Sequence, residues 1–533
     1  MAARDRARSG VAPGYHRRID RLEKMRRRLP VVDRLPAPGS RRALPLAKGE
    51  APTPTFAVWE LTLACDHRCR HCGPRAAKAR PDELSTDECL RLVDELAELG
   101  VGEVVLIGGE AYLRDDFLLV IRACRERGMS VTMTTGGWGL TPERCAAAKQ
   151  AGLRGVSVSI DGLRESHDHV RRPGSWDRAF AALRHAKAAG LPIASNTQIN
   201  QRSAGELLPL LELLGAEGIH GWQIQLTMAH GNAADHPELL VQPHMLIELY
   251  QSIDTVIDRC DELGIRLWPA NNIGYFGPIE QRLRFHQTGG RHFSGCKAGL
   301  RTVGIESNGT IKSCPSLGGP VNDGGSWREH GLRALWERAP EIGYTRHRTL
   351  DDLWGYCREC YYASTCMAGC TATSEPLLGR PGNNPYCLHR ALEMDRMGLR
   401  ERIEAVRGAE DVPFGAGLFR LIREPKDPAA RGEPGACQVE EPRVDRRQEP
   451  HGPGRPAAER RSHRGEEDGY AVVVPPEPEP LPVSPLPLPE PSEPEPPSLD
   501  SEPEPPEDEP SAAVVESSSG GVVSSEVSTS GPA

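Results

Sequence analysis

An alternation of strand-like and helix-like segments runs through the middle of the chain, and no other feature limits the fold as strongly. Six short apolar segments between residues 55 and 226 read as strands, and a helical pattern follows each of them. The expected strands are 55–63, 103–107, 130–135, 155–160, 193–199 and 222–226, and the expected helices are 85–99, 115–127, 141–151, 175–189, a stretch from 203, and 243–263. Strand–helix units in series imply a parallel sheet with right-handed crossovers, so we predict an α/β fold.

Several helix boundaries carry their own signals. Ser85-Thr-Asp-Glu88 is a capping box before the first helix, and Thr141-Pro142 predicts the start of the third. Ser203-Ala-Gly-Glu206 predicts a similar cap for the fifth helix. Because ligands of such sheets bind at the carboxyl ends of the strands, functional residues are expected just after each strand.

Three cysteines follow the first strand. Cys65, Cys69 and Cys72 have the spacing C-x3-C-x2-C at the end of the apolar run 56–64. Cysteine thiolates are the usual ligands of iron–sulfur clusters, and three of them can hold three corners of a 4Fe–4S cube. The fourth iron would then be open to a small molecule. Half of a zinc site is the alternative, although zinc sites tend to use C-x2-C pairs.

The stretch C-D-H-R-C-R-H-C (65–72) resembles the cluster motif of the radical S-adenosylmethionine (SAM) enzymes. The resemblance implies that the open iron chelates SAM, and that reductive cleavage of SAM yields a 5′-deoxyadenosyl radical that abstracts hydrogen. It also implies a partial (β/α)6 TIM-type barrel over residues 53–285, open on one side for a large substrate. His71 occupies the position of the family's usual aromatic residue against the adenine.

Gly108-Gly109-Glu110 directly follows the second strand. It resembles the family's G-G-E motif, whose backbone and acid hold the methionine amino group of SAM. Glycines let the backbone come close to a ligand, and an acid can attract an ammonium group. Ala111 stands where proline often follows in the family. An ordinary strand-to-helix turn is the structural alternative.

A polar run closes the fourth strand. Ser159 and Asp161-Gly162, with Arg171 ahead of a glycine, resemble the S-x-D-G…H-D…R run of peptide-modifying members of the family. The resemblance implies that Ser159 and Asp161 contact the ribose of SAM and that Arg171 pairs with the methionine carboxylate. Asn196 on the fifth strand is a further candidate. A solvated Asp-Gly turn is the alternative.

Seven more cysteines fall between residues 296 and 387. Their pattern, in which four residues separate Gly309 from the second cysteine, resembles that of the SPASM domain, which carries auxiliary iron–sulfur clusters. The seven are Cys296, Cys314, Cys357, Cys360, Cys366, Cys370 and Cys387.

By the resemblance, two auxiliary 4Fe–4S clusters share these cysteines. Cys357, Cys360, Cys366 and Cys387 hold one cluster completely. Cys296, Cys314 and Cys370 hold the other, whose fourth iron is open or takes a ligand such as His292. Two zinc sites are the alternative.

The two ends of the chain differ in charge. The first 50 residues are basic, the last 60 or so are acidic and proline-rich, and the net charge is -9. We expect a basic flexible arm over 1–52, the barrel over 53–285, the SPASM domain over 286–410 and a disordered tail over 411–533. The arm has no recognition motif for nucleic acid, so nucleic-acid binding is not expected.

The location follows from what the sequence does not contain. No apolar run is long enough to span a membrane and no signal-peptide core is visible. Many cysteines in a long chain without an export signal favour metal ligation. We therefore expect a cytoplasmic enzyme.

SPASM domains accompany radical enzymes that modify peptides or proteins, often ribosomally made precursors. The first hypothesis is therefore a peptide maturase that oxidises a residue of a peptide or protein, with a ferredoxin or flavodoxin as reductant. Sulfatase-type maturation to formylglycine and a cofactor-pathway role on a tetrapyrrole are enzymatic alternatives. An iron–sulfur electron-transfer protein without radical chemistry is the non-enzymatic one.

Overall fold

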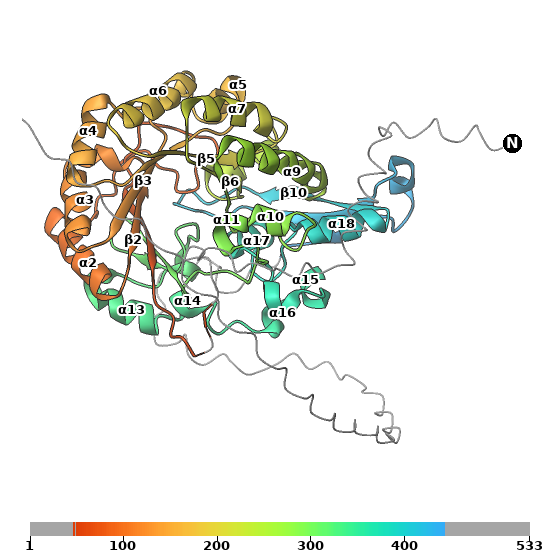
Figure 1. Ribbon diagram of the computed structural model, residues 1–533. Coiled ribbons are helices and arrows are strands. Elements are labelled where there is room, and N and C mark those ends of the chain that lie inside the picture. The colour runs from red at the N-terminus through yellow and green to blue at the C-terminus, as the bar shows by residue number, and fades with distance from the viewer. Residues whose placement is uncertain (1–45, 48, 443–533) are drawn as a thin grey trace, which may run out of the picture. The chain divides into compact units, whose positions relative to one another are not determined.

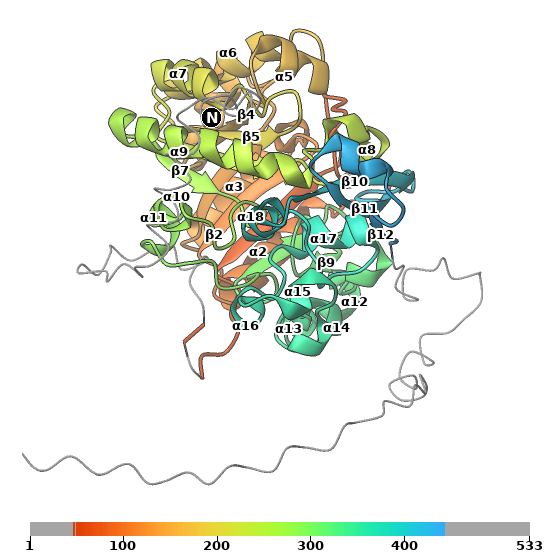
Figure 2. The same cartoon turned by 90° about the vertical axis from the view of Figure 1, so that its right-hand side faces the viewer.

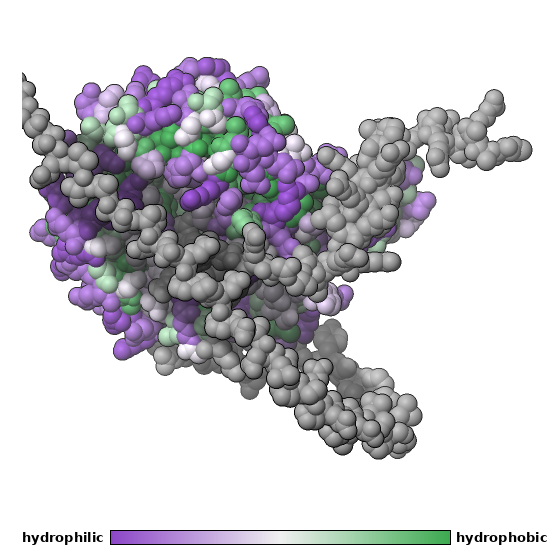
Figure 3. All heavy atoms as spheres, in the orientation of Figure 1, coloured by the Kyte–Doolittle hydropathy of each residue, from purple (hydrophilic) through white to green (hydrophobic). Residues whose placement is uncertain are grey.

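A computed structural model describes residues 46, 47 and 49–442, all of which belong to one compact unit. A curved sheet occupies the middle of that unit, and helices surround its outer face (Figure 1). The predicted basic arm up to residue 45 and the tail from residue 443 lie outside the described residues. In the view of Figure 3, polar side chains cover much of the outer helices. None of the described helices is both long and apolar enough to cross a membrane.

All six predicted strands form and lie in parallel, neighbour to neighbour. They are β1 (Phe56–Thr62), β2 (Glu103–Gly108), β3 (Ser130–Thr135), β4 (Val156–Ser159), β5 (Ile193–Ile199) and β6 (Gly221–Leu226). β7 (Arg266–Pro269) adds a seventh parallel strand beside β6. The strand–helix order and the parallel pairing confirm the α/β partial barrel.

The sheet continues across the boundary predicted at residue 285. β8 (Thr302–Ile305) pairs in parallel with β1, and β9 (Ile311–Lys312) pairs antiparallel with β8. The sheet therefore has nine strands in the order β7-β6-β5-β4-β3-β2-β1-β8-β9. The cysteine-rich region begins as an extension of the barrel sheet at its β1 edge, so its first strands are not separate from the barrel.

The helices predicted between the strands form close to their expected bounds. They are α2 (Thr86–Glu98), α3 (Phe117–Glu126), α4 (Pro142–Ala151), α6 (Ser175–Ala188), α7 (Leu207–Glu217) and α9 (Leu246–Leu263). The Ser85 capping box is present, and the Thr141 hydroxyl accepts the Arg144 N–H at 3.3 Å. The predicted Ser203 cap was wrong, because the Ser203 hydroxyl accepts the Asn200 N–H and α7 begins after Glu206.

The remaining helical segments are short and were not predicted as separate elements. They are α5 (Arg164–Val170), α8 (Asn232–Asp235), α10 (Glu280–Leu283), α11 (Phe285–Thr288), α12 (Trp327–His330), α13 (Leu332–Arg338), α14 (Pro340–Gly343), α15 (Tyr356–Glu359), α16 (Ala363–Cys366), α17 (Thr371–Leu378) and α18 (Leu388–Arg396). Short 3-10 turns occur at Ala111–Leu113, Pro237–Leu239, Pro243–Met245, Pro320–Asn322, Leu350–Asp352 and Pro428–Gly432.

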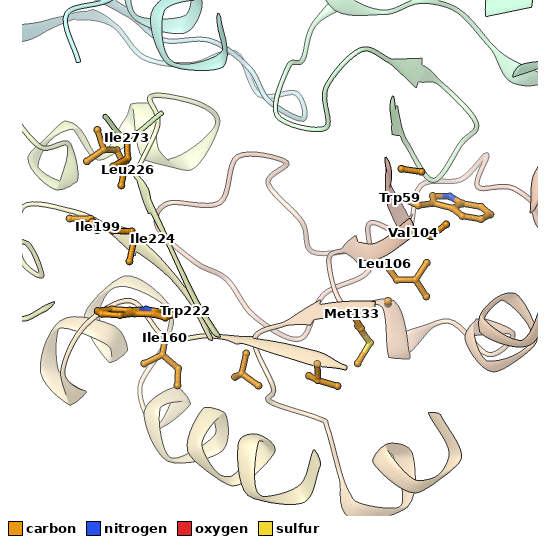
Figure 4. Packing of buried hydrophobic residues seen from close by; sticks show 14 of the residues in the cluster. Trp59, Val104, Leu106, Met133, Ile160, Ile199, Trp222, Ile224, Leu226 and Ile273 are labelled. Atoms are coloured by element: carbon orange, nitrogen blue, oxygen red, sulfur yellow. The ribbon is translucent and has the colours of Figure 1, made fainter. Parts of the chain in front are cut away.

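The two faces of the barrel sheet carry different side chains. Trp222, Ile224 and Leu226 of β6 are buried in the core against the helices, and Figure 4 shows such residues along several strands. Because side chains alternate along a strand, Gln223 and Gln225 point to the opposite, inner face, where they are half-buried. The barrel therefore has an apolar outer wall and a partly open, polar interior.

The prediction that the folded part ends near residue 410 was wrong. β10 (Leu399–Arg407), β11 (Leu418–Pro425) and β12 (Gln438–Glu440) form an antiparallel sheet (Figure 2). In β11, apolar residues such as Phe419 and Leu421 are buried. Neighbouring charged residues hide this short apolar pattern in the sequence.

The segment between β10 and β11 returns to the barrel. The Phe414 N–H donates to the Gly73 carbonyl at 2.8 Å, next to the barrel cysteines. The Phe414 ring lies against Gly73 and Gly318, which belong to loops far apart in the chain. Residues beyond the boundary predicted near residue 410 therefore help to hold the loop of the barrel cysteines in place.

Candidate functional site

The barrel cysteines lie in the loop that leaves β1 at its carboxyl end. The Cys65 N–H donates to the Ala77 carbonyl at 3.2 Å, so both ends of the loop are joined. The Cys65 sulfur accepts the His67 N–H, and the Cys72 sulfur accepts the Ala76 N–H, each at 3.3 Å. Hydrogen bonds to sulfur are typical of thiolates that ligate metals.

These thiols fit a metal cluster better than they fit a metal-free interior. Burial raises the pKa of Cys69 to about 12 and that of Cys65 well above its usual range. Ligation removes the thiol protons and supplies the positive charge that a buried thiolate needs. The loop can therefore hold three irons of a 4Fe–4S cluster, as the sequence predicts.

The glycines of the G-G-E segment are required by close packing. Gly108 has a φ of +147°, and a Cβ there would lie 2.2 Å from the Thr62 carbonyl oxygen. A Cβ on Gly109 would lie 1.9 Å from the Ala64 carbonyl oxygen. The end of β2 thus lies directly against the cysteine loop, which places the acid of the motif beside the cluster ligands.

Glu110 is buried between the cysteine loop and the end of β3. Its carboxylate accepts the Thr135 hydroxyl at 2.5 Å and the Gly136 N–H at 2.6 Å. Burial raises its pKa to about 8, although these two hydrogen bonds oppose the shift. Ligand atoms of Glu110, Cys65 and Asp66 all lie within 4.8 Å of one another. A cationic amino group bound here would favour the ionised form of the Glu110 carboxyl group and so lower its pKa.

Two residues beside Glu110 have buried polar atoms that make no hydrogen bond with the described residues, although His67 Nε2 lies 3.9 Å from Asp66 Oδ1. Both ring nitrogens of buried His67 and the Oδ1 atom of Asp66 are buried without a hydrogen bond. A Cβ on Gly136 would lie 2.5 Å from His67 Nε2 and 2.9 Å from Glu110. These groups suit a small polar ligand. The sequence analysis did not select them, because nothing in the motif reveals which loop atoms are buried.

His71, Asp161 and Arg171 form one buried cluster. The Asp161 carboxylate accepts His71 Nε2–H at 2.8 Å, Arg171 Nε–H at 2.6 Å and the Gln198 N–H at 2.9 Å. Burial alone would raise the pKa of Asp161, but Arg171 and His71 hold it well below its usual range. The family resemblance implied separate roles toward SAM for these residues, whereas here Asp161 has three donors within the protein.

Ser159 and Asn196 are adjacent across the β4–β5 pair and face the barrel interior. Asn196 Nδ2 donates to the Thr134 hydroxyl of β3 at 3.4 Å, which joins inner-face residues across β4. Both residues are half-buried, so they can contact a molecule inside the barrel.

Four of the C-terminal cysteines meet at one cavity. Cys357, Cys360, Cys366 and Cys387 all line it, together with aromatic residues such as Tyr362. These are the four residues that the sequence analysis assigned to a complete auxiliary cluster.

The other three cysteines gather beside Tyr344. Burial, with the nearby Cys296 and Cys314 thiolates, raises the pKa of Cys370 to about 12. The Cys296 sulfur lies 3.8 Å from the Tyr344 hydroxyl. His292, the alternative ligand, instead lies 3.7 Å from Glu280 and stacks on Phe276.

Comparisons with known proteins show the family to which the chain belongs. Residues 59–200 match the model of the radical SAM superfamily. An AdoMet-dependent heme synthase of Methanosarcina barkeri is 30% identical over 63% of this chain and 97% of its own length. The chain belongs to the radical SAM superfamily.

One further relative and one solved structure are also similar to this chain. The mycofactocin maturase MftC of Mycobacterium ulcerans is 27% identical over 67% of this chain and 95% of its own length. The structure "Native anSMEcpe with bound AdoMet" aligns with a TM-score of 0.50, at 13% identity, over 63% of this chain and 94% of that one. That likeness shows a shared fold.

Membership of the radical SAM superfamily makes the protein an enzyme that uses a 4Fe–4S cluster and SAM. The non-enzymatic electron-transfer alternative is therefore not retained.

Proposed function

We propose that this radical SAM enzyme oxidatively modifies a peptide or protein substrate. Cys65, Cys69 and Cys72 would hold the barrel cluster. When bound, the cluster and SAM supply hydrogen-atom abstraction by a 5′-deoxyadenosyl radical. We propose the barrel over residues 53–285 and the SPASM domain from residue 286, with the folded part extended to residue 442 and with β8 and β9 joined to the barrel sheet.

The residues around the barrel cysteines would bind and orient SAM. Glu110, with the backbone of Gly108 and Gly109, would hold the methionine amino group. The unpartnered atoms of His67 and Asp66 support a polar ligand at this point. The other proposed contacts of SAM are Ser159, Asp161, Arg171, Asn196 and His71.

The two sets of C-terminal cysteines would hold two auxiliary 4Fe–4S clusters. Cys357, Cys360, Cys366 and Cys387 would hold one, and their shared cavity supports this assignment. Cys296, Cys314 and Cys370 would hold the other. Such clusters could pass on the second electron of a net oxidation, and a ferredoxin or flavodoxin would supply reducing electrons.

The residue types on the inner face of the barrel are the observation that supports a peptide as the substrate. Its half-buried positions on β3 to β6 include no charged residue within these described strands. They are Ser130, Thr132, Thr134, Ser157, Ser159, Ala194, Asn196, Gln198, Gln223 and Gln225. Neutral amides and hydroxyls both donate and accept hydrogen bonds, so they match the alternating N–H and C=O groups of an extended peptide.

A tetrapyrrole substrate is the second candidate. Its support is the 30% identity to an AdoMet-dependent heme synthase. A macrocycle that carries several carboxylates would be expected to meet arginine or lysine side chains. The inner face of β3 to β6 has no such cation, and the same face of β1 and β2 carries the acids Glu60 and Glu103, so the face favours the peptide. Formylglycine formation has less support, since no acid closely follows Cys314.

The test uses the full-length, reconstituted and reduced enzyme. It is incubated with SAM and either peptides encoded by neighbouring reading frames or an iron coproporphyrin, and products are followed by mass spectrometry. A mass loss in a peptide supports the proposal, whereas conversion of the porphyrin alone contradicts it.

Two variants test whether the inner face of the barrel binds the peptide. Gln223→Leu combined with Gln225→Leu should raise the KM for the peptide severalfold, because amide contacts are lost. Gln251→Leu, on the outer helix α9, should leave KM unchanged. An equal effect of both changes would contradict recognition by the inner face.

A further inference from the structure

Arg171 stands between a buried carboxylate and a proposed cluster ligand. Its side chain is only 8% exposed. Nε lies 2.6 Å from Asp161 Oδ2, and one terminal nitrogen lies 3.9 Å from the Cys69 sulfur. The guanidinium therefore places a positive charge and an N–H group beside one of the three barrel thiolates.

The protein itself fixes this orientation. Asp161 is completely buried and is held by His71 and by the Gln198 N–H as well as by Arg171. Arg171 is thus aimed at Cys69 by contacts within the protein. A buried ion pair is weak evidence for stability, because desolvation of the two charges offsets much of their attraction. The arrangement needs another explanation.

We propose that Arg171 sets the reduction potential of the barrel cluster, and that Asp161 is its positioning residue. Hydrogen bonds to the sulfurs and the local net charge are two of the factors that set the potential of iron–sulfur clusters. A cation near Cys69 stabilises the more negative, reduced state and so eases reduction. The inference rests on the proposed assignment of Cys69 as a ligand.

The proposal predicts that changing Arg171 and changing Asp161 shift the midpoint potential in opposite directions. Arg171→Gln removes the positive charge and leaves the Asp161 carboxylate near the cluster, so the midpoint potential should fall. Asp161→Asn leaves the positive charge uncompensated, so the potential should rise. Arg171→Lys keeps the charge and should stay nearer to the wild type than Arg171→Gln does.

Arg164 and Asp177 provide a matched control. They form an arginine–aspartate pair with two contacts, at 2.6 and 2.7 Å, and both side chains are exposed to solvent. Solvent screens exposed charges, so Arg164→Gln should not change the potential. The control separates a local effect on the cluster from a general effect of removing one arginine.

The experiment is a redox titration of the reconstituted full-length protein without SAM, followed by electron paramagnetic resonance. The barrel signal is identified by its loss when Cys65, Cys69 and Cys72 are all replaced by alanine. We expect Arg171→Gln to lower the equilibrium constant for reduction of the barrel cluster at least tenfold. This corresponds to a fall in the midpoint potential of about 59 mV for a one-electron couple.

Shifts of opposite sign for Arg171→Gln and Asp161→Asn support the inference. Unchanged potentials, or shifts in the same direction, overturn it while the barrel assignment stands. If Arg171→Gln does not assemble the cluster, the sign of the Asp161→Asn shift decides. A wild-type protein without a barrel signal would overturn the proposed site together with the inference. Failure to modify any peptide would affect only the proposed substrate.

Discussion

The two cysteine-rich regions are built in different ways. The barrel cysteines lie on a loop that is tied to regular strands, and the Glu110 N–H donates to the Ala64 carbonyl at 2.8 Å. The C-terminal cysteines lie on and between short segments, such as α15 and α16 with four residues each. Met367 and Ala368, which follow Cys366, both have positive φ angles of 50° and 58°.

This difference indicates what each cluster does for the fold. The barrel loop also contains one non-glycine residue with a positive φ, Arg75 at 52°, but the sheet holds both ends of this loop, so its proposed cluster is needed mainly for chemistry. Positive φ angles in residues other than glycine need support from their surroundings. Where a site has little regular structure of its own, the free energy of metal binding contributes to folding. The auxiliary clusters are therefore expected to be structural as well as redox-active.

The largest expected effect comes from removing the barrel ligands. Replacing Cys65, Cys69 and Cys72 by alanine should abolish SAM cleavage, because no other proposed cluster adjoins Gly108-Gly109-Glu110. The melting temperature and the auxiliary absorbance should stay close to those of the wild type. The measurements are 5′-deoxyadenosine by chromatography and thermal unfolding by circular dichroism. Retained 5′-deoxyadenosine formation would contradict the assignment.

The corresponding change in the C-terminal region should affect the fold instead. The wild type should reconstitute to about 12 iron atoms, as three cubes of four irons require. Replacing Cys357, Cys360, Cys366 and Cys387 by alanine should remove about 4 of them. Hydrogen exchange should then increase over α15 to α18 but not over β1 to β6.

Two results would argue against that contrast. One is a stable wild-type preparation that saturates at about 4 iron atoms and contains zinc. That result would mean that the C-terminal cysteines bind zinc and hold no auxiliary clusters. The other is unchanged hydrogen exchange in the C-terminal variant, which would mean that this region folds without its metal.

The barrel was predictable from sequence because its signals are local. Apolar runs mark the strands, and Ser85 and Thr141 mark helix starts by hydrogen bonds within one turn. The Ser203 cap failed because the same hydroxyl had a competing donor in the Asn200 N–H. The residue types in this stretch do not show whether the Ser203 hydroxyl accepts the Asn200 N–H or an N–H of the helix that follows.

The site was predictable only as a set of residues, not as contacts. Motif spacing selected His71, Asp161 and Arg171, yet nothing in the spacing shows that they bond to one another. His67 was missed because its burial depends on Gly136, which lies on another strand end. Likewise, β11 was missed because its burial depends on long-range packing.

A buried ionic network joins β10 to α18 and β11 in the C-terminal region. Glu401 of β10 accepts Arg390 at 2.6 Å and Arg423 at 2.9 Å. Glu401→Gln should lower the free energy of unfolding by about 3–5 kcal/mol, because it leaves buried guanidinium charge uncompensated. Chemical denaturation monitored at a C-terminal tryptophan such as Trp354 measures the change.

The pH dependence of that variant has a defined sign. Burial would raise the pKa of Glu401, but Arg390 and Arg423 lower it overall. A carboxyl group with a lowered folded-state pKa contributes stability above its unfolded pKa and loses it as the pH falls. The wild type should therefore lose more stability below about pH 4.5 than Glu401→Gln does. Glu212→Gln breaks the exposed pair with Arg259 and should change the free energy of unfolding far less than Glu401→Gln does.

The smallest expected effect tests where the C-terminal region ends. Asn383 donates to Glu440 of β12 at 3.1 Å and accepts Arg390 at 2.7 Å, so β12 connects to the Glu401 network. Deleting residues 443–533, which are rich in proline and glutamate toward the end, should leave iron content and SAM cleavage unchanged. Deleting residues 426–533 removes β12 as well and should lower the auxiliary iron content modestly.

Iron analysis and 5′-deoxyadenosine formation on both truncated proteins distinguish the two boundaries. The shorter protein should still cleave SAM, since the barrel loop is held by the sheet and by Phe414, which both truncations keep. Loss of cleavage in the longer protein would mean that residues after 442 belong to the catalytic fold. Equal iron content in the two truncated proteins would mean that β12 is dispensable for the auxiliary clusters.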